Sequence, residues 1–175
     1  MKKIAIDIGH ANRTGATGNG YDEHALCERL AHSLKESLES FKVDSFQAEI
    51  IDFPTYSNKA DLAATIKAIN SGGYDLSISL HMDASENPTA HGAHVCYYSQ
   101  NGKRLASEIA RRLCPQLPGR AETIKKRTDL AILKKTHPVA VLVECGFITH
   151  AGDAHWVSKA PEKVALAIAL GIAAY

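Results

Sequence analysis

Short apolar runs alternate with helical patterns along the chain, and this alternation constrains the fold more than any other feature. The expected strands are residues 4–8, 48–53, 75–80, 92–99, 129–133 and 139–147. Strands that alternate with helices are typical of βαβ units, in which helices cover both faces of a mostly parallel sheet. The sequence therefore predicts an α/β fold with a twisted, mostly parallel sheet of about six strands.

The first helix is expected to begin at about Glu23, and it carries one apolar stripe. Its leucines follow one another at four-residue spacing, at Leu26, Leu30, Leu34 and Leu38. Residues at this spacing lie on one face of an α-helix and can pack against the sheet. Further helices are expected at residues 61–70, 102–113 and 162–175.

Length and charge bound the class of protein. The 175 residues fall in the usual size range of one domain, and no repeat, linker or low-complexity tract divides them. Residues 1–175 are therefore expected to form a single domain, and a monomer is expected. The 20 Lys and Arg against 19 Asp and Glu leave a formal net charge of +1. That balance implies no overall attraction to nucleic acid or to an anionic membrane.

Neither a membrane span nor a signal peptide is expected. No apolar stretch approaches the ~20 residues that a transmembrane helix needs. The first strand begins almost at Met1, which leaves no room for a leader. The cysteines lack CxxC spacing, which argues against a thiolate zinc site or a disulfide framework. They are expected to be buried free thiols at Cys27, Cys96, Cys114 and Cys145.

Three of the expected strands end in a side chain that can bind a metal or transfer a proton. His10 follows the first strand, His81 follows the third, and Glu144 ends the apolar run of the last. Ligands of open parallel sheets bind in the crevice outside the carboxyl ends of the strands, so these side chains can converge there. One such histidine could be a turn residue bonded to backbone. Two on separate strands favour a shared ligand role.

Glu23 is a further candidate ligand, although its position has two explanations. A glutamate in the first turn of a helix is favoured by the helix dipole alone. Leu26, Cys27 and Leu30 lie three, four and seven residues further on, so Glu23 also lies above the buried stripe and faces the sheet. Two imidazoles and one carboxylate, His10, His81 and Glu23, form a sound zinc ligand set with a fourth position for water.

Glu144 lies inside a strongly apolar run, where an unpaired carboxylate is costly and its pKa rises. A carboxylate with such a pKa suits a general base that later acts as a general acid in a zinc hydrolase. The competing interpretation is a structural glutamate that pairs with Arg127 or Lys135.

The motifs of the chain, taken in order, resemble those of one enzyme family. They are D-x-G-H at residues 7–10, a glycine-rich loop with E-x(7)-A at 23–31, S-x-S-L-H-x-D-A at 77–84, G-x-x-V-x-Y-Y at 92–98 and P-V-A-V-L-V-E-C-G-F at 138–147. This pattern is similar to that of the zinc-dependent N-acetylmuramoyl-L-alanine amidases of the Amidase_3 type. The family includes autolysins, sporulation amidases and catalytic domains of phage endolysins. The resemblance spans essentially the whole chain.

The resemblance implies hydrolysis of the amide between the lactyl group of N-acetylmuramic acid and the L-alanine of the peptidoglycan stem peptide. His10, Glu23 and His81 match the family's ligands for one zinc ion, and Glu144 matches its catalytic glutamate, acting with a metal-activated water. The expected partner is peptidoglycan and the place of action is the bacterial cell wall. A phage lysin, a sporulation enzyme and an excised domain of a secreted protein all fit.

Three residues are hypotheses for substrate contact. Asp83 stands where family members commonly have Asn, so it brings a negative charge near a stem peptide that already carries carboxylates. Arg127 leads into the expected strand at 129–133, beside the Glu144 strand, and could bind those carboxylates. His91 lies near the crevice in the same scheme.

Two other functions use the same residues. A zinc peptidase that cleaves within a cell-wall peptide needs the same chemistry, because zinc and a glutamate hydrolyse any well-placed amide. A metal-bound cell-wall binding module would retain the ligands but has no need of Glu144. The sequence leaves both alternatives open.

Overall fold

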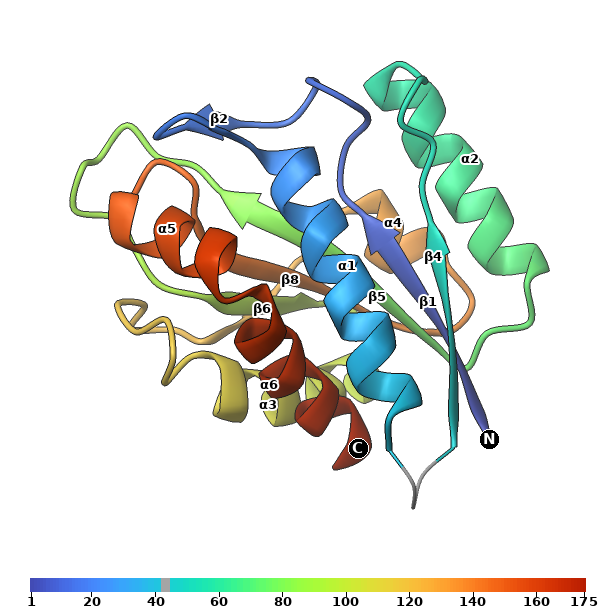
Figure 1. The fold of residues 1–175 in the computed structure, drawn as a ribbon. Helices are drawn as coiled ribbons and strands as arrows, with labels where there is room; N and C mark the ends of the chain where they lie inside the picture. Colours follow the sequence, from blue (N-terminus) through green and yellow to red (C-terminus); the bar gives the residue numbers. More distant parts are fainter. Residues whose placement is uncertain (42–44) are drawn as a thin grey trace.

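A six-stranded sheet forms the middle layer of the molecule (Figure 1), as seen in a computed structural model that describes residues 1–41 and 45–175. Its strands, in spatial order, are β4 (Phe46–Ile51), β1 (Lys2–Ile8), β5 (Leu76–Asp83), β8 (Val139–Phe147), β6 (His94–Tyr97) and β7 (Ile124–Lys126). Neighbouring strands run parallel, except that β6 is antiparallel to β8. The predicted α/β fold with a mostly parallel sheet is confirmed.

Helices cover the sheet on both faces (Figure 1). One face packs against α1 (Glu23–Glu39), α3 (Gln100–Leu113), α5 (Ala151–Lys159) and α6 (Pro161–Ala173). The other face packs against α2 (Asn58–Ser71) and the short α4 (Ala131–Lys135). The larger apolar core therefore lies on the α1 side, and a smaller one lies on the α2 side.

Helix α1 shows how the sequence sets an element and its orientation. It begins where Asp22 Oδ1 accepts a hydrogen bond from the Ala25 amide at 3.1 Å, which satisfies a backbone donor of the first turn. The predicted stripe is buried against the sheet at Leu26, Leu30, Leu34 and Leu38. This orientation turns the first residue of the helix, Glu23, toward the carboxyl ends of the strands.

Alternation along the strands sends polar side chains to the α2 side. In β1, Ile4, Ile6 and Ile8 enter the larger core, so Asp7 points to the opposite face. In β5, Ile78 and Leu80 enter the larger core in the same way. The intervening polar residues of β5, which share the face of Asp7, are Ser77, Ser79 and His81.

The strand predicted at residues 129–133 is wrong. Residues Ala131–Lys135 form helix α4, with Leu130 at its N-cap, because a short apolar run fits a buried helical turn as well as a strand. The strand at this edge is β7, which falls on the basic residues Lys125 and Lys126. An edge strand with exposed charged side chains carries little apolar pattern, and such charges protect it from pairing with other chains.

The prediction also lacked a hairpin and a helix. The glycine-rich loop contains a small hairpin of β2 (Thr17–Gly18) and β3 (Tyr21–Asp22), joined by Asn19 and Gly20, whose φ angles are +51° and +80°. Two positive φ angles in a two-residue loop are typical of a type I′ turn, for which Asn-Gly is a strong sequence signal. Helix α5 was also missed. The predicted last helix is confirmed, and it begins at Pro161.

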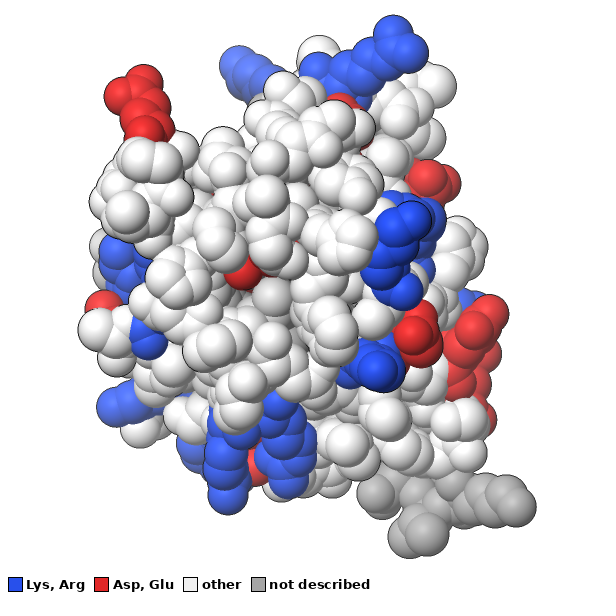
Figure 2. All heavy atoms as spheres, turned by 60° about the vertical axis from the view of Figure 1, so that its left-hand side comes forward, with Lys and Arg blue, Asp and Glu red and all other residues white. Residues whose placement is uncertain are grey.

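The cysteines and the charged side chains can now be located in the structure. All four cysteines are free and buried, as predicted. On the face shown in Figure 2, blue and red side chains lie mainly near the margins, and uncharged residues cover most of the middle. Within residues 1–41 and 45–175, no helix is long and apolar enough to cross a membrane.

Candidate active site

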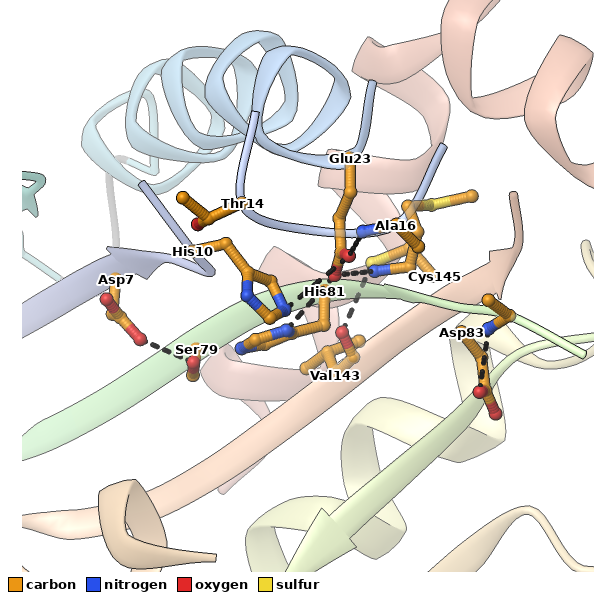
Figure 3. Close-up of polar contacts among 12 residues, drawn as sticks. Asp7, His10, Thr14, Ala16, Glu23, Ser79, His81, Asp83, Val143 and Cys145 are labelled. Carbon is orange, nitrogen blue, oxygen red and sulfur yellow. Dashed lines mark hydrogen bonds and ion pairs between the residues drawn. The ribbon is translucent and has the colours of Figure 1, made fainter. Parts of the chain in front are cut away.

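Three predicted metal ligands meet at the carboxyl end of the sheet. His10 follows β1, His81 lies near the end of β5, and Glu23 reaches them from the start of α1 (Figure 3). One ligand atom of each lies within 4.8 Å of the others. His81 Nδ1 is 3.2 Å from Glu23 Oε1, and His10 Nε2 is 3.5 Å from Glu23 Oε2. The geometry fits the prediction that these three residues share one point.

The backbone around the histidines is shaped by close approach. His10 has a φ of +64°, in the left-handed region that residues other than glycine seldom adopt. A Cβ at Gly9 would collide with the ring of His81, and a Cβ at Gly15 would come 2.8 Å from Glu23 Oε2. Both positions therefore need glycine, because a larger residue would push the ligand side chains apart.

The Glu23 carboxylate is held by backbone donors as well as by imidazoles. Oε2 accepts a hydrogen bond from the Ala16 amide at 2.8 Å, and Oε1 accepts one from the Met82 amide at 3.1 Å. Glu23 is only 2% exposed. These contacts explain why a buried carboxylate is tolerated, and they fix the direction of its oxygens before any ligand arrives.

The pKa values of these residues reflect their proximity. Burial alone would raise the pKa of Glu23, but the hydrogen bond with His81 and the nearby imidazoles lower it. Burial opposes the charged form of His81, yet the bond with Glu23 and the charge of Glu144 raise its pKa to about 9. The carboxylates of Glu23 and Glu144 thus favour a positive charge at His81. Two nitrogen donors and one carboxylate oxygen this close together fit a zinc ion.

Glu144 lies beside the ligand cluster. In the sheet it is the register partner of His81 in β5 on one side and of His94 in β6 on the other. Its Oε2 is buried and has no hydrogen-bond partner among the described residues. Burial raises the pKa of Glu144 to about 7, and the charge of His81 partly opposes that rise.

The competing pairing of Glu144 with Arg127 does not form. Arg127 instead binds Asp129 through two hydrogen bonds, Nε to Oδ1 at 2.9 Å and Nη2 to Oδ2 at 2.6 Å. Its charge still lowers the pKa of Glu144. Arg127 is therefore a neighbour of Glu144 and not its ion-pair partner. Arg127 lies near Glu144 because it directly follows β7. The prediction instead placed it ahead of a strand at residues 129–133.

The other two predicted substrate contacts lie in different surroundings. Asp83 is near Glu144, since its charge helps raise the pKa of that carboxyl, and its Oδ2 is 3.9 Å from Arg120 Nη2. His91 packs against His150, with ring centroids 5.0 Å apart and ring planes tilted by 32°. Its Nδ1 lies 2.8 Å from the carbonyl oxygen of Thr89. Asp83 thus lies near Glu144, whereas the contacts of His91 are with neighbouring loops.

Two further residues, Arg120 and His94, lie on the same side of the site. Arg120 lies over the ring of Phe147, 5.1 Å from its centroid, and close to Asp83. His94 is buried beside Glu144, and its pKa is lowered to about 4 by burial and by the charges of nearby Arg and Lys residues. The alternation of residues 94–97 could have indicated the direction of His94. The position of Arg120 depends on a loop that no sequence pattern defines.

Comparisons with known proteins agree with this geometry. The family model described as N-acetylmuramoyl-L-alanine amidase matches residues 4–174. The N-acetylmuramoyl-L-alanine amidase LytC of Bacillus subtilis is 29% identical over 180 residues, which cover 98% of this chain but 35% of LytC. The chain thus spans about a third of the length of that relative.

Solved structures share the fold over the whole chain. The catalytic domain of the CD27L endolysin targeting Clostridia difficile superposes with a TM-score of 0.88 at 29% identity, covering 99% of this chain and 98% of that domain. The catalytic domain of CwlV from Bacillus (Paenibacillus) polymyxa var. colistinus gives a TM-score of 0.86 at 21% identity, covering 100% and 98%. With a matching model over nearly every residue, the chain belongs to the N-acetylmuramoyl-L-alanine amidase family.

Proposed function

We propose that this protein is a zinc-dependent amidase that acts on peptidoglycan. The bond it cleaves is the amide between the lactyl group of N-acetylmuramic acid and the L-alanine of the stem peptide. The observation that carries the proposal is the meeting of His10, Glu23 and His81 within 4.8 Å, with Glu144 next to His81 in the sheet. Membership of the amidase family supports the choice of bond.

His10, Glu23 and His81 would hold one zinc ion per chain. When bound, zinc supplies a Lewis acid that polarises the scissile carbonyl and makes water a stronger nucleophile near neutral pH. The protein supplies a prepared set of donors. Glu23 is already oriented by two backbone amides, and the glycines at positions 9 and 15 allow the histidine and glutamate side chains to approach.

Glu144 would act as the general base and then as the general acid. Its carboxylate takes a proton from the attacking water, and it returns the proton to the leaving nitrogen of L-alanine. A pKa of about 7 suits both steps, because a carboxyl of this strength exchanges protons readily near neutral pH. The buried Oε2, with no partner in the described part of the chain, is available for that exchange.

Charged residues around Glu144 would position the stem peptide. Arg127 and Arg120 lie on the β6–β7 side of the glutamate and could bind peptide carboxylates, while Asp83 would hold Arg120 or face a peptide amide. His91 remains a proposed contact on the surrounding loops. We also propose that the protein acts on the bacterial cell wall and that it does so as a monomer.

Mass spectrometry of digested peptidoglycan tests this function. Purified peptidoglycan is incubated with the zinc-loaded protein, with the protein plus chelator, and with Glu144→Ala. We expect free stem peptides that begin with L-alanine from the first digest alone. Cleavage within the stem would instead assign a peptidase, and binding to the wall without any cleavage would assign a binding module.

A further inference from the structure

A cavity of about 180 Å³ opens beside the candidate metal ligands on the α2 side of the sheet. Gly9, His10 and His81 form its wall toward the ligand cluster. Leu62 of α2 and Leu130 before α4 also line it, and Leu62 remains 39% exposed. The cavity therefore joins the active site on one side and has exposed apolar surface on another.

Four polar side chains from separate elements line the same cavity. Asp7 and Ser79 come from β1 and β5, and Ser79 Oγ donates a hydrogen bond to Asp7 Oδ2 (Figure 3). Asp61 and Thr65 come from α2, one helical turn apart. Each of the four is at most 5% exposed. A mostly apolar cavity thus carries a compact group of oxygen atoms.

Two of these oxygens lack a partner. Asp61 Oδ1 and Thr65 Oγ1 are buried and make no hydrogen bond to any described residue. Buried polar atoms are nearly always paired in folded proteins, because an unpaired one loses its hydration without compensation. Both atoms belong to residues that line the cavity, so a group that enters it can supply the missing bonds.

We propose that this cavity is a substrate subsite that binds a neutral hydrogen-bond donor, a hydroxyl or an amide N–H, next to the scissile bond. The proposal rests on the proposed amidase function. Carboxylate and hydroxyl oxygens accept such donors. The chemistry is that of a neutral group and not of an ammonium, because the adjoining ligands would already hold a divalent cation.

The substrate has two sources of this chemistry. The sugar carries hydroxyls and an acetamido N–H, and the first residues of the stem peptide carry amide N–H groups. Muramyl dipeptide carries both, whereas O-methyl-lactoyl-L-alanyl-D-isoglutamine, in which a methyl ether replaces the ether to the sugar, carries only the peptide donors. The two compounds therefore separate the sources.

Calorimetric titration of the zinc-loaded Glu144→Gln protein tests the subsite, because an inactive protein reports binding without turnover. Thr65→Val, added to that protein, removes a hydroxyl at nearly constant volume and should weaken muramyl dipeptide binding about threefold to tenfold. Asp61→Asn should weaken it by about tenfold. Ser71→Ala at the far end of α2, where the hydroxyl bonds its own helix, is the matched control and should change nothing.

The sugar-free compound identifies the source. A loss in Thr65→Val that persists with it assigns a peptide N–H, and a loss that disappears assigns a donor on the sugar. Thermal melts of each variant establish that it is folded. If neither compound binds, or if the α2 variants bind as the control does, the subsite is wrong and water alone fills the cavity.

Turnover by the unmodified protein separates the two proposals. If the unmodified protein cleaves peptidoglycan but Thr65→Val binds muramyl dipeptide as tightly as its parent does, the amidase function stands and the subsite is wrong. If Thr65→Val weakens binding but the unmodified protein cleaves nothing, the subsite stands and the amidase function is wrong.

Discussion

The two faces of the sheet differ in what they bury. The face toward α1, α3 and α6 is a continuous apolar core, built on strand residues such as Ile6, Ile78 and Val143. In α1 and α5 of this face, His24 Nδ1 and Trp156 Nε1 are buried without a partner in the described ranges. The opposite face, toward α2 and α4, buries more polar side chains. Several of their atoms lack a hydrogen-bond partner within the described ranges, at Asp61, Thr65, Ser77, His94 and Glu144.

This difference shows where stability and function are placed. The apolar face follows the rule that buried side chains stabilise by leaving water. The polar face departs from that rule, since each unpaired buried group costs stability. Departures of this kind are expected at functional sites, and the candidate ligands and Glu144 lie at the carboxyl end of this same sheet. Substitutions on the two faces should therefore have opposite consequences.

The largest expected effect is on activity, at Glu144. Glu144→Gln should lower amide hydrolysis about a hundredfold to ten-thousandfold, because the proton acceptor is lost. Its thermal stability should equal or exceed that of the unmodified protein, because a carboxylate with an unpaired buried oxygen is replaced by a neutral amide. Turnover and melting curves are measured together. Glu28→Gln on the exposed side of α1 is the control and should alter neither.

Substitutions on the apolar face should lower the stability of the protein. Leu34 is fully buried in the stripe of α1, and Leu34→Ala should lower the free energy of unfolding by about 2–5 kcal/mol through lost burial and the cavity left behind. Urea denaturation measures it. Leu166, which is 46% exposed on α6, supplies the control. Equal losses from Leu34→Ala and Leu166→Ala would contradict the assignment of the core.

Asp7 tests the cost of polarity on the other face. Burial raises the pKa of Asp7 to about 6, and the hydrogen bond from Ser79 offsets only part of that rise. A carboxyl with a raised pKa binds its proton more tightly in the folded state, so its contribution to stability is lost as pH rises from about 4 to about 6. In metal-free protein, Asp7→Asn should therefore be more stable than the unmodified chain above pH 6, by about 1–3 kcal/mol.

The comparison at low pH completes that experiment. At pH 4 the Asp7 carboxyl is mostly protonated in the folded state, and the advantage of Asp7→Asn should vanish. Denaturation at pH 4 and at pH 7.5 gives both values. An advantage of the same size at both pH values would show that ionisation of Asp7 is not its cause.

The smallest expected effect is at Arg127. Arg127→Gln should raise KM about threefold to tenfold for stem peptides with free carboxylates and leave kcat nearly unchanged, because a partly exposed charge contributes modestly to binding. Amidated stems should show little change. Arg111→Gln, on an exposed arginine of α3, is the control. Equal kinetics of Arg127→Gln and the unmodified chain on both kinds of stem would remove Arg127 from the proposed contacts.

The sequence predicted the sheet and the proximity of the candidate ligands because both follow from local patterns. Because His10 and His81 each follow an apolar strand, the sequence alone places both at the carboxyl end of the sheet. The spacing of the leucine stripe then shows that Glu23 faces the sheet. The structure brings these residues together as expected. The register of β5 and β8 then places Glu144 beside His81.

The parts that failed depend on tertiary context. Residues 129–133 are too short and apolar to separate a strand from the helix that they begin, and β7 lies in a basic segment without alternation. The cavity joins Asp61 and Thr65 of α2 to Asp7 across a helix–sheet contact. No spacing along the chain encodes that contact. The Asn19–Gly20 turn, in contrast, had a local signal that was missed.

Zinc titration of metal-free protein tests the central claim most directly. Chelated protein is titrated with zinc while release of L-alanyl stem peptides is recorded. The account predicts no activity without metal, a linear rise, and saturation at one zinc per chain. Full activity without zinc, or saturation at another stoichiometry, would contradict a single metal centre formed by His10, Glu23 and His81.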